Sequence, residues 1–99
     1  SNGFIMSVSD DAILEAVQMT PKLSGVFGEP AGVAGVAGLR KATAEGLIGE
    51  NASVLVVVTG NGLKDVNTAR KAVGQPLISD PNMDVLEETL RMHGAAGIT

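Results

Sequence analysis

The chain has 99 residues, a formal net charge of −4 at pH 7, one histidine and no cysteine. The length fits one small domain or a piece of a larger one, and the missing cysteines exclude disulfides and thiolate metal sites. The negative charge, the 2% aromatic content and the lack of a run of ~20 apolar residues disfavour nucleic-acid and membrane partners, so we expect a soluble cytoplasmic protein.

The first residues, 1–3, read as a protease-cleavage scar from an expression tag, which leaves 4–99 as the folded segment. The apolar run 4–8 predicts a short strand. Ser9 then stands where an N-cap is expected, with two aspartates in the first turn of a helix that Pro21 and Gly25 end. The predicted buried stripe of this helix is Ile13, Leu14 and Val17.

The next segment predicts an alanine-rich helix from Pro30 to Gly46. Gly32, Gly35 and Gly38 recur in it at every third position. Each interior glycine costs a helix roughly 1 kcal/mol relative to alanine, so a compensating interaction is needed. We therefore expect this helix to lie close to another backbone or to a flat ligand.

Residues 53–58 predict a buried strand, followed by a helix over 62–73. The apolar side of that helix is Leu63, Val66, Ala69 and Val73. Asp80 and Pro81 are expected to cap and start a last helix, which places Glu87 four residues before Arg91 and ends at Gly94.

This order of elements predicts the α/β class, as a partial three-layer unit with two short parallel strands and about four helices. Two parallel strands leave unpaired edges and open faces, so they make a poor domain by themselves. The sequence is therefore interpreted as a slice of a larger protein, and we expect the isolated chain to self-associate.

The motif Thr59-Gly60-Asn61-Gly62 ends the second predicted strand. A strand end that opens onto a helix start is where backbone amides meet small polar or anionic groups. The motif matches neither a P-loop nor a dinucleotide fingerprint. A purely structural interpretation is also open, in which the glycines supply an unusual φ and the threonine ends the strand.

Three charged or titratable residues have structural explanations. Glu29 precedes a helix start, where a carboxylate meets the helix dipole favourably, and His93 falls at a helix C-terminus, which favours a cation. Lys64 lies off the apolar face of its helix, so we expect it to be solvated. No catalytic cluster and no metal-ligand set emerges.

Three stretches resemble the C-terminal part of threonine synthase, a pyridoxal-phosphate (PLP) enzyme of the tryptophan-synthase-β fold group: VSDDAILEAV, GVFGEPAGVAGVAGL and VVVTGNGLKD. The resemblance covers residues 8–73 well and the tail to Leu90 loosely. It implies a slice of a fold type II PLP enzyme, a carbon–oxygen lyase that converts O-phosphohomoserine and water to threonine and phosphate. It also implies that residues 4–99 are a C-terminal segment of the catalytic domain.

The resemblance further implies a cofactor-binding role for Thr59, Gly60 and Glu29. The Thr59 hydroxyl would face the pyridine nitrogen, Gly60 would let the ring lie close, and Glu29 would lie near the cofactor end of the sheet. The family's cofactor-linking lysine and phosphate loop belong to motifs that this sequence lacks. The chain alone is thus expected to be inactive and to bind no cofactor, and to need the remainder of its parent enzyme and a small amino-acid substrate.

Two alternatives stay open. One is a fragment of a related PLP lyase, such as cysteate synthase or a threonine or serine dehydratase, although the dehydratases usually carry a Ser-Gly-Gly-Asn type sequence at this strand end. The other is a freestanding α/β binding or interaction module that holds a small anion at the same turn.

Overall fold

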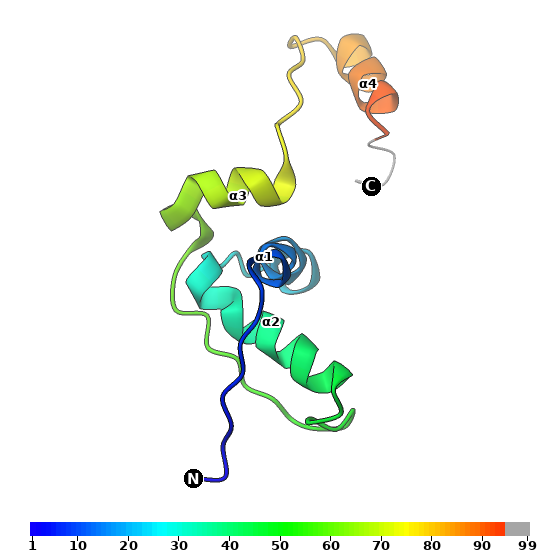
Figure 1. Cartoon of the computed structure of the whole chain (residues 1–99). Coiled ribbons are helices and arrows are strands. Elements are labelled where there is room, and N and C mark those ends of the chain that lie inside the picture. Colours follow the sequence, from blue (N-terminus) through cyan, green and yellow to red (C-terminus); the bar gives the residue numbers. More distant parts are fainter. Residues whose placement is uncertain (95–99) are drawn as a thin grey trace.

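The computed structural model describes residues 1–94, and this part of the chain contains four α-helices and one 3-10 helix (Figure 1). The bounds are Asp10–Ser24 for α1, Pro30–Ala44 for α2, Gly62–Asp65 for η1, Val66–Val73 for α3 and Met83–Met92 for α4. The predicted segment 4–99 ends in residues that lie outside this description.

The two predicted strands are not formed in the described part of the chain. Residues 4–8 and 53–58 have no sheet pairing, and the one β-bridge there joins Gly28 to Asn61. Both segments nevertheless border one apolar groove on α2, whose lining includes Phe4, Met6 and residues 54–57. An isolated pair of strands is marginal without further neighbours, which explains why the apolar pattern alone did not produce a sheet.

Helix α1 begins as predicted, but its end differs. The Ser9 hydroxyl accepts a hydrogen bond from the Ala12 backbone N–H at 3.1 Å, which confirms the N-cap. Pro21 lies inside the helix and does not end it. The helix continues to Gly25, which adopts φ 75° and donates its N–H to the Pro21 carbonyl at 2.9 Å. The left-handed conformation that favours glycine therefore sets this boundary.

Helices α1 and α2 pack together around a small core. Its fully buried members are Ala16, Val17, Val33 and Ala37. Of the predicted stripe on α1, Val17 is buried while Ile13 and Leu14 are half-buried. Pro30 begins α2 as predicted, and the helix ends at Ala44, two residues before Gly46 with its φ of 74°. Small side chains at this interface allow the two helices to approach closely.

Both later helices were predicted, but each starts differently from the prediction. The segment 62–73 begins with the short 3-10 helix η1 and continues as α3. Helix α4 is capped by Asn82, whose side chain accepts hydrogen bonds from two backbone N–H groups, and not by Asp80 and Pro81. Glu87 and Arg91 do not form an ion pair among the described residues, and α4 ends at Met92, two residues before the predicted Gly94.

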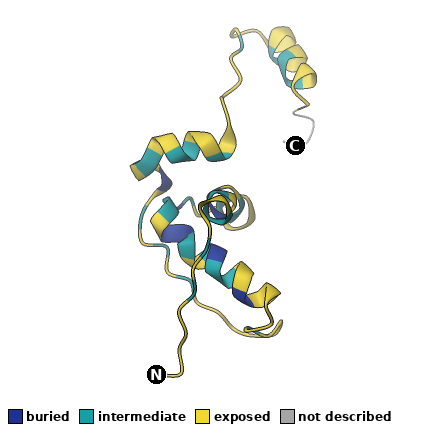
Figure 2. Ribbon diagram, viewed as in Figure 1, coloured by how far each residue is buried: buried dark blue, intermediate teal, exposed yellow. Residues whose placement is uncertain are grey.

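The described chain is extended, with α4 standing apart from the helical layer (Figure 1). The radius of gyration is 17.1 Å, whereas a compact chain of this length has about 13 Å. Many large apolar side chains are exposed, among them Leu55 at 89% and Leu63 at 70%. In the described part of the chain, buried positions are confined to α1, α2, Gly28 just before α2 and the start of η1 (Figure 2). Within the described residues no helix combines the length and apolarity needed to cross a membrane.

Candidate functional site

The turn after residue 58 is bonded to the segment that leads into α2. The Glu29 N–H donates to the Gly60 carbonyl at 2.9 Å, and the Gly62 N–H donates to the Phe27 carbonyl at 3.0 Å. These two bonds flank the antiparallel bridge between Gly28 and Asn61. The predicted strand end and the start of α2, some thirty positions apart in the sequence, therefore form one unit, here called the junction (residues 27–29 and 59–62).

Glycines at the junction are required for space and not for backbone conformation. Neither Gly60 nor Gly62 has a positive φ, so the interpretation that they supply an unusual φ is wrong. A Cβ at Gly28 would lie 2.6 Å from methyl carbons of Val33 and Val58. A Cβ at Gly62 would overlap the Phe27 ring. The side chains of Phe27, Val33 and Val58 thus fill the places where Cβ atoms would be.

At Gly60 the place of a Cβ atom is filled by the side chain of Glu29. A Cβ on Gly60 would overlap the Glu29 carboxylate, so that carboxylate lies directly against the Gly60 Cα. Two of the three residues predicted for cofactor binding are therefore in mutual contact. The close approach at Gly60 on this side is made by a side chain of the same chain.

Glu29 does not act as a simple helix-start acid. It occupies the N-cap position of α2, yet its side chain makes no capping hydrogen bond. The carboxylate instead lies 3.5 Å from the Lys64 ammonium, measured from Oε1 to Nζ. The Glu29 side chain is 19% exposed and that of Lys64 is 70% exposed. Lys64 is thus largely solvated, as predicted, but it also pairs with Glu29, and no local sequence pattern indicates this pair.

Thr59, the third predicted site residue, is exposed beside this contact. It borders a shallow surface depression of about 260 Å³, whose lining is Val26, Phe27, Val58, Thr59, Gly60 and Asn61. The Asn61 side chain is occupied locally, because its Oδ1 accepts the Leu63 N–H at 2.9 Å. The Thr59 hydroxyl forms no hydrogen bond with any other described residue, so it is available to a ligand from outside this segment.

Asp65 ends η1 and caps α3. Its carboxylate accepts hydrogen bonds from the Thr68 hydroxyl at 2.7 Å and from the Thr68 backbone N–H at 3.0 Å. These bonds, the hydroxyl contributing most, lower the pKa of Asp65 below its ordinary value. The capped carboxylate fixes where η1 passes into α3, and with it the position of Lys64 on the preceding turn.

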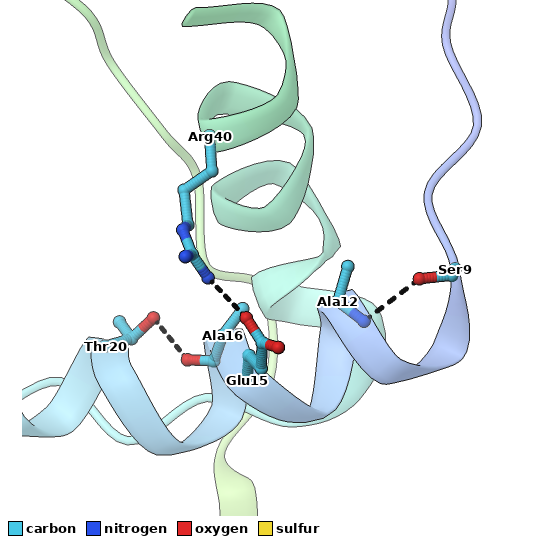
Figure 3. A network of polar contacts seen from close by, with 6 residues as sticks. All are labelled: Ser9, Ala12, Glu15, Ala16, Thr20 and Arg40. Atoms are coloured by element: carbon cyan, nitrogen blue, oxygen red, sulfur yellow. Dashed lines mark hydrogen bonds and ion pairs between the residues drawn. The ribbon is translucent and has the colours of Figure 1, made fainter. Parts of the chain in front are cut away.

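A second group of polar contacts lies away from the junction, between α1 and α2. Arg40 points from α2 toward Glu15 of α1, with 2.9 Å between Nη1 and Oε2 (Figure 3). Lys41 donates to the Ser7 carbonyl at 2.8 Å, which ties residues 4–8 to α2. Both contacts hold segments together. Likewise, His93 forms a local contact with the Thr89 carbonyl, and no cluster of metal-ligating side chains occurs in residues 1–94.

A two-helix core, large apolar surfaces and a glycine-rich junction define a section of a larger protein and not a complete domain. No protein-family model matches the chain. The sequence is 51% identical over 73 residues to threonine synthase of Halalkalibacterium halodurans, 35% over 91 residues to that of Methanocaldococcus jannaschii, and 45% over 71 residues to that of Mycobacterium tuberculosis. These matches cover 74%, 92% and 72% of the chain.

The chain therefore belongs to the threonine synthase family, as the resemblance of its motifs predicted. It spans only about a fifth of the length of these relatives, namely 21%, 22% and 20%. A stretch of 73 residues in a chain of 99 must include residues 27–73, so the first of these matches spans the whole junction.

Proposed function

We propose that this segment forms one edge of the cofactor site in a PLP-dependent threonine synthase, which converts O-phospho-L-homoserine and water to L-threonine and phosphate. The observation that carries the proposal is the 51% identical match, because it spans Glu29, Thr59 and Lys64 together. The similarity to threonine synthases of several distant organisms favours this enzyme over a dehydratase or cysteate synthase.

The residues at the junction are compatible with PLP. When bound, PLP supplies an electron sink for the bond changes in an amino-acid substrate. The exposed Thr59 hydroxyl has no partner among the described residues and can donate a hydrogen bond to an unprotonated ring nitrogen. Gly60 and Glu29 would support this contact from behind, since the Glu29 carboxylate already fills the space beside the Gly60 Cα.

The α/β architecture belongs to the same proposal. Residues 4–8 and 53–58 border one groove on α2, so neighbouring strands from the remainder of the parent enzyme could complete a parallel sheet there. Residues 4–99 would then be the C-terminal segment of the catalytic domain of a cytoplasmic enzyme. A freestanding module that binds a small anion at the junction is the competing function.

The test is an assay of the full-length protein that contains this segment. With PLP added, we expect it to release threonine and phosphate in equal amounts from O-phospho-L-homoserine. Keto-acid formation from threonine or serine, without threonine synthesis, would favour a dehydratase instead. Neither activity, combined with binding of inorganic phosphate by the 99-residue chain, would favour the anion-binding module.

The isolated chain should behave differently from the full-length enzyme. Because the family's lysine motif is absent and Lys64 is exposed and paired with Glu29, we expect no stoichiometric attachment of PLP to the fragment. Borohydride reduction followed by peptide mapping measures this. A stoichiometric adduct at Lys64 would contradict the assignment and make Lys64 a covalent site.

A further inference from the structure

We propose that Lys64 is a positioning residue, which holds the Glu29 carboxylate against Gly60 and thereby fixes Thr59 for cofactor binding. The inference rests on the proposed function, since it concerns the same edge of the cofactor site. It assigns a role to a lysine whose sequence position indicated only a solvated side chain.

Three contacts converge on Glu29. Its backbone N–H is bonded to the Gly60 carbonyl, its carboxylate lies against the Gly60 Cα, and the same carboxylate faces the Lys64 ammonium. The side chain makes no capping hydrogen bond at the start of α2. A carboxylate that is only 19% exposed and does not cap its helix is stabilised by a nearby cation. Within the described residues, Lys64 is the cation that pairs with it.

Lys64 is connected to Thr59 by a short and well-defined stretch of chain. The Asn61 side chain caps η1, and the Lys64 N–H donates to the Asn61 carbonyl at 3.0 Å. The lysine therefore projects from the turn that directly follows the strand end. The ion pair with Glu29 therefore links the side chains of this turn and of the start of α2, in addition to the backbone hydrogen bonds of the junction.

Folding stability is a weak explanation for this pair. A lysine that is 70% exposed loses little solvation and gains little from an ion pair at 3.5 Å. Without Lys64, however, the 19% exposed Glu29 carboxylate loses its cation and has reason to turn toward solvent. That movement would uncover Gly60 and loosen the neighbouring Thr59, so the loss should appear in cofactor binding more than in unfolding.

The experiment uses the full-length enzyme and compares Lys64→Met with Lys64→Arg. The matched control is Arg40→Met, which breaks the α1–α2 ion pair at a distance from the junction. We expect Lys64→Met to weaken PLP affinity about fivefold, measured by absorbance titration, with the unfolding temperature of the apoenzyme within about 2 °C of wild type. Lys64→Arg and Arg40→Met should both retain the wild-type affinity within about twofold.

A double-mutant cycle distinguishes positioning through Glu29 from any direct effect of the lysine. Glu29→Gln should weaken PLP affinity by a similar factor, and adding Lys64→Met to it should cause no further loss. Wild-type affinity in Lys64→Met, or fully additive losses in the double variant, would overturn the inference while threonine synthesis by the wild type still supports the proposed function. A wild-type enzyme that binds no PLP would overturn both.

Discussion

Gly32 of α2 lies against the backbone of Gly60, so that a Cβ at residue 32 would stand 3.3 Å from both the nitrogen and the oxygen of Gly60. The next glycine of the stripe, Gly35, would place its Cβ 3.3 Å from a methyl carbon of Val56. The predicted close approach to another backbone is therefore confirmed at Gly32, whereas Gly35 faces a side chain. Gly38 is the exception, since nothing lies within 4 Å of its Cβ position.

This difference predicts opposite effects of alanine at two glycines of one helix. Gly38→Ala should raise the free energy of unfolding of the chain by about 0.5–1 kcal/mol, because alanine is the better helix former and space is open. Gly32→Ala should fail to show this gain, since backbone atoms of Thr59 and Gly60 would have to move. Urea unfolding followed by circular dichroism measures both. Equal stabilisation by the two substitutions would contradict the packing of α2 on the strand end.

Helix positions were predictable because their signals are local. Ser9, Pro30 and Gly25 act through hydrogen bonds or φ preferences within a few residues, and each lies at or next to the expected boundary. The strands at 4–8 and 53–58 were not recovered as paired elements, since sheet pairing depends on neighbours that need not lie in this segment.

The site was predictable only in part, for the same reason. Thr59 and Gly60 carry a family motif, and the structure brings Glu29 to them through the bond from Glu29 to the Gly60 carbonyl. The pairing of Glu29 with Lys64 joins residues 35 positions apart, and no local pattern indicates it. Short-range chemistry was thus visible in the sequence, and contacts between distant segments required the fold.

The cap on α3 predicts a pH dependence. Because the folded pKa of Asp65 is lowered, its stabilising contribution is complete above the unfolded value of ~3.9 and is lost as the pH falls through the lower folded value. Thr68→Val removes the hydroxyl that contributes most, so the pKa of Asp65 should rise toward its ordinary value. Carboxyl-carbon NMR titration measures this shift. Thr89→Val, which removes a hydroxyl from α4, is the control and should leave Asp65 unchanged.

Exposed apolar side chains predict self-association of the isolated chain. Leu55 is 89% exposed and borders the groove shared with residues 4–8. Unpaired segments with exposed apolar surfaces tend to associate, so light scattering should detect oligomers of the wild-type fragment. Leu55→Lys should shift the distribution toward monomer, whereas Asn51→Lys adds the same charge at an exposed position and should have a smaller effect. A compact wild-type monomer at high concentration would count against the fragment interpretation.

The sharpest test of the candidate site is substitution of Thr59 in the full-length enzyme. Thr59→Val keeps the shape of the side chain but removes its hydroxyl, which leaves the ring nitrogen of PLP without a donor at a cost of roughly 1–3 kcal/mol. PLP affinity and turnover should therefore both fall.

Thr59→Asp should act differently, because a carboxylate favours a protonated ring nitrogen and so changes how strongly the ring withdraws electrons. We expect this variant to divert O-phospho-L-homoserine from threonine toward keto acid. The measurement is PLP affinity and the yields of threonine and keto acid for wild type and both variants. If Thr59→Val stays within about twofold of wild type in affinity and turnover, the hydroxyl only ends the strand segment and does not bind the cofactor.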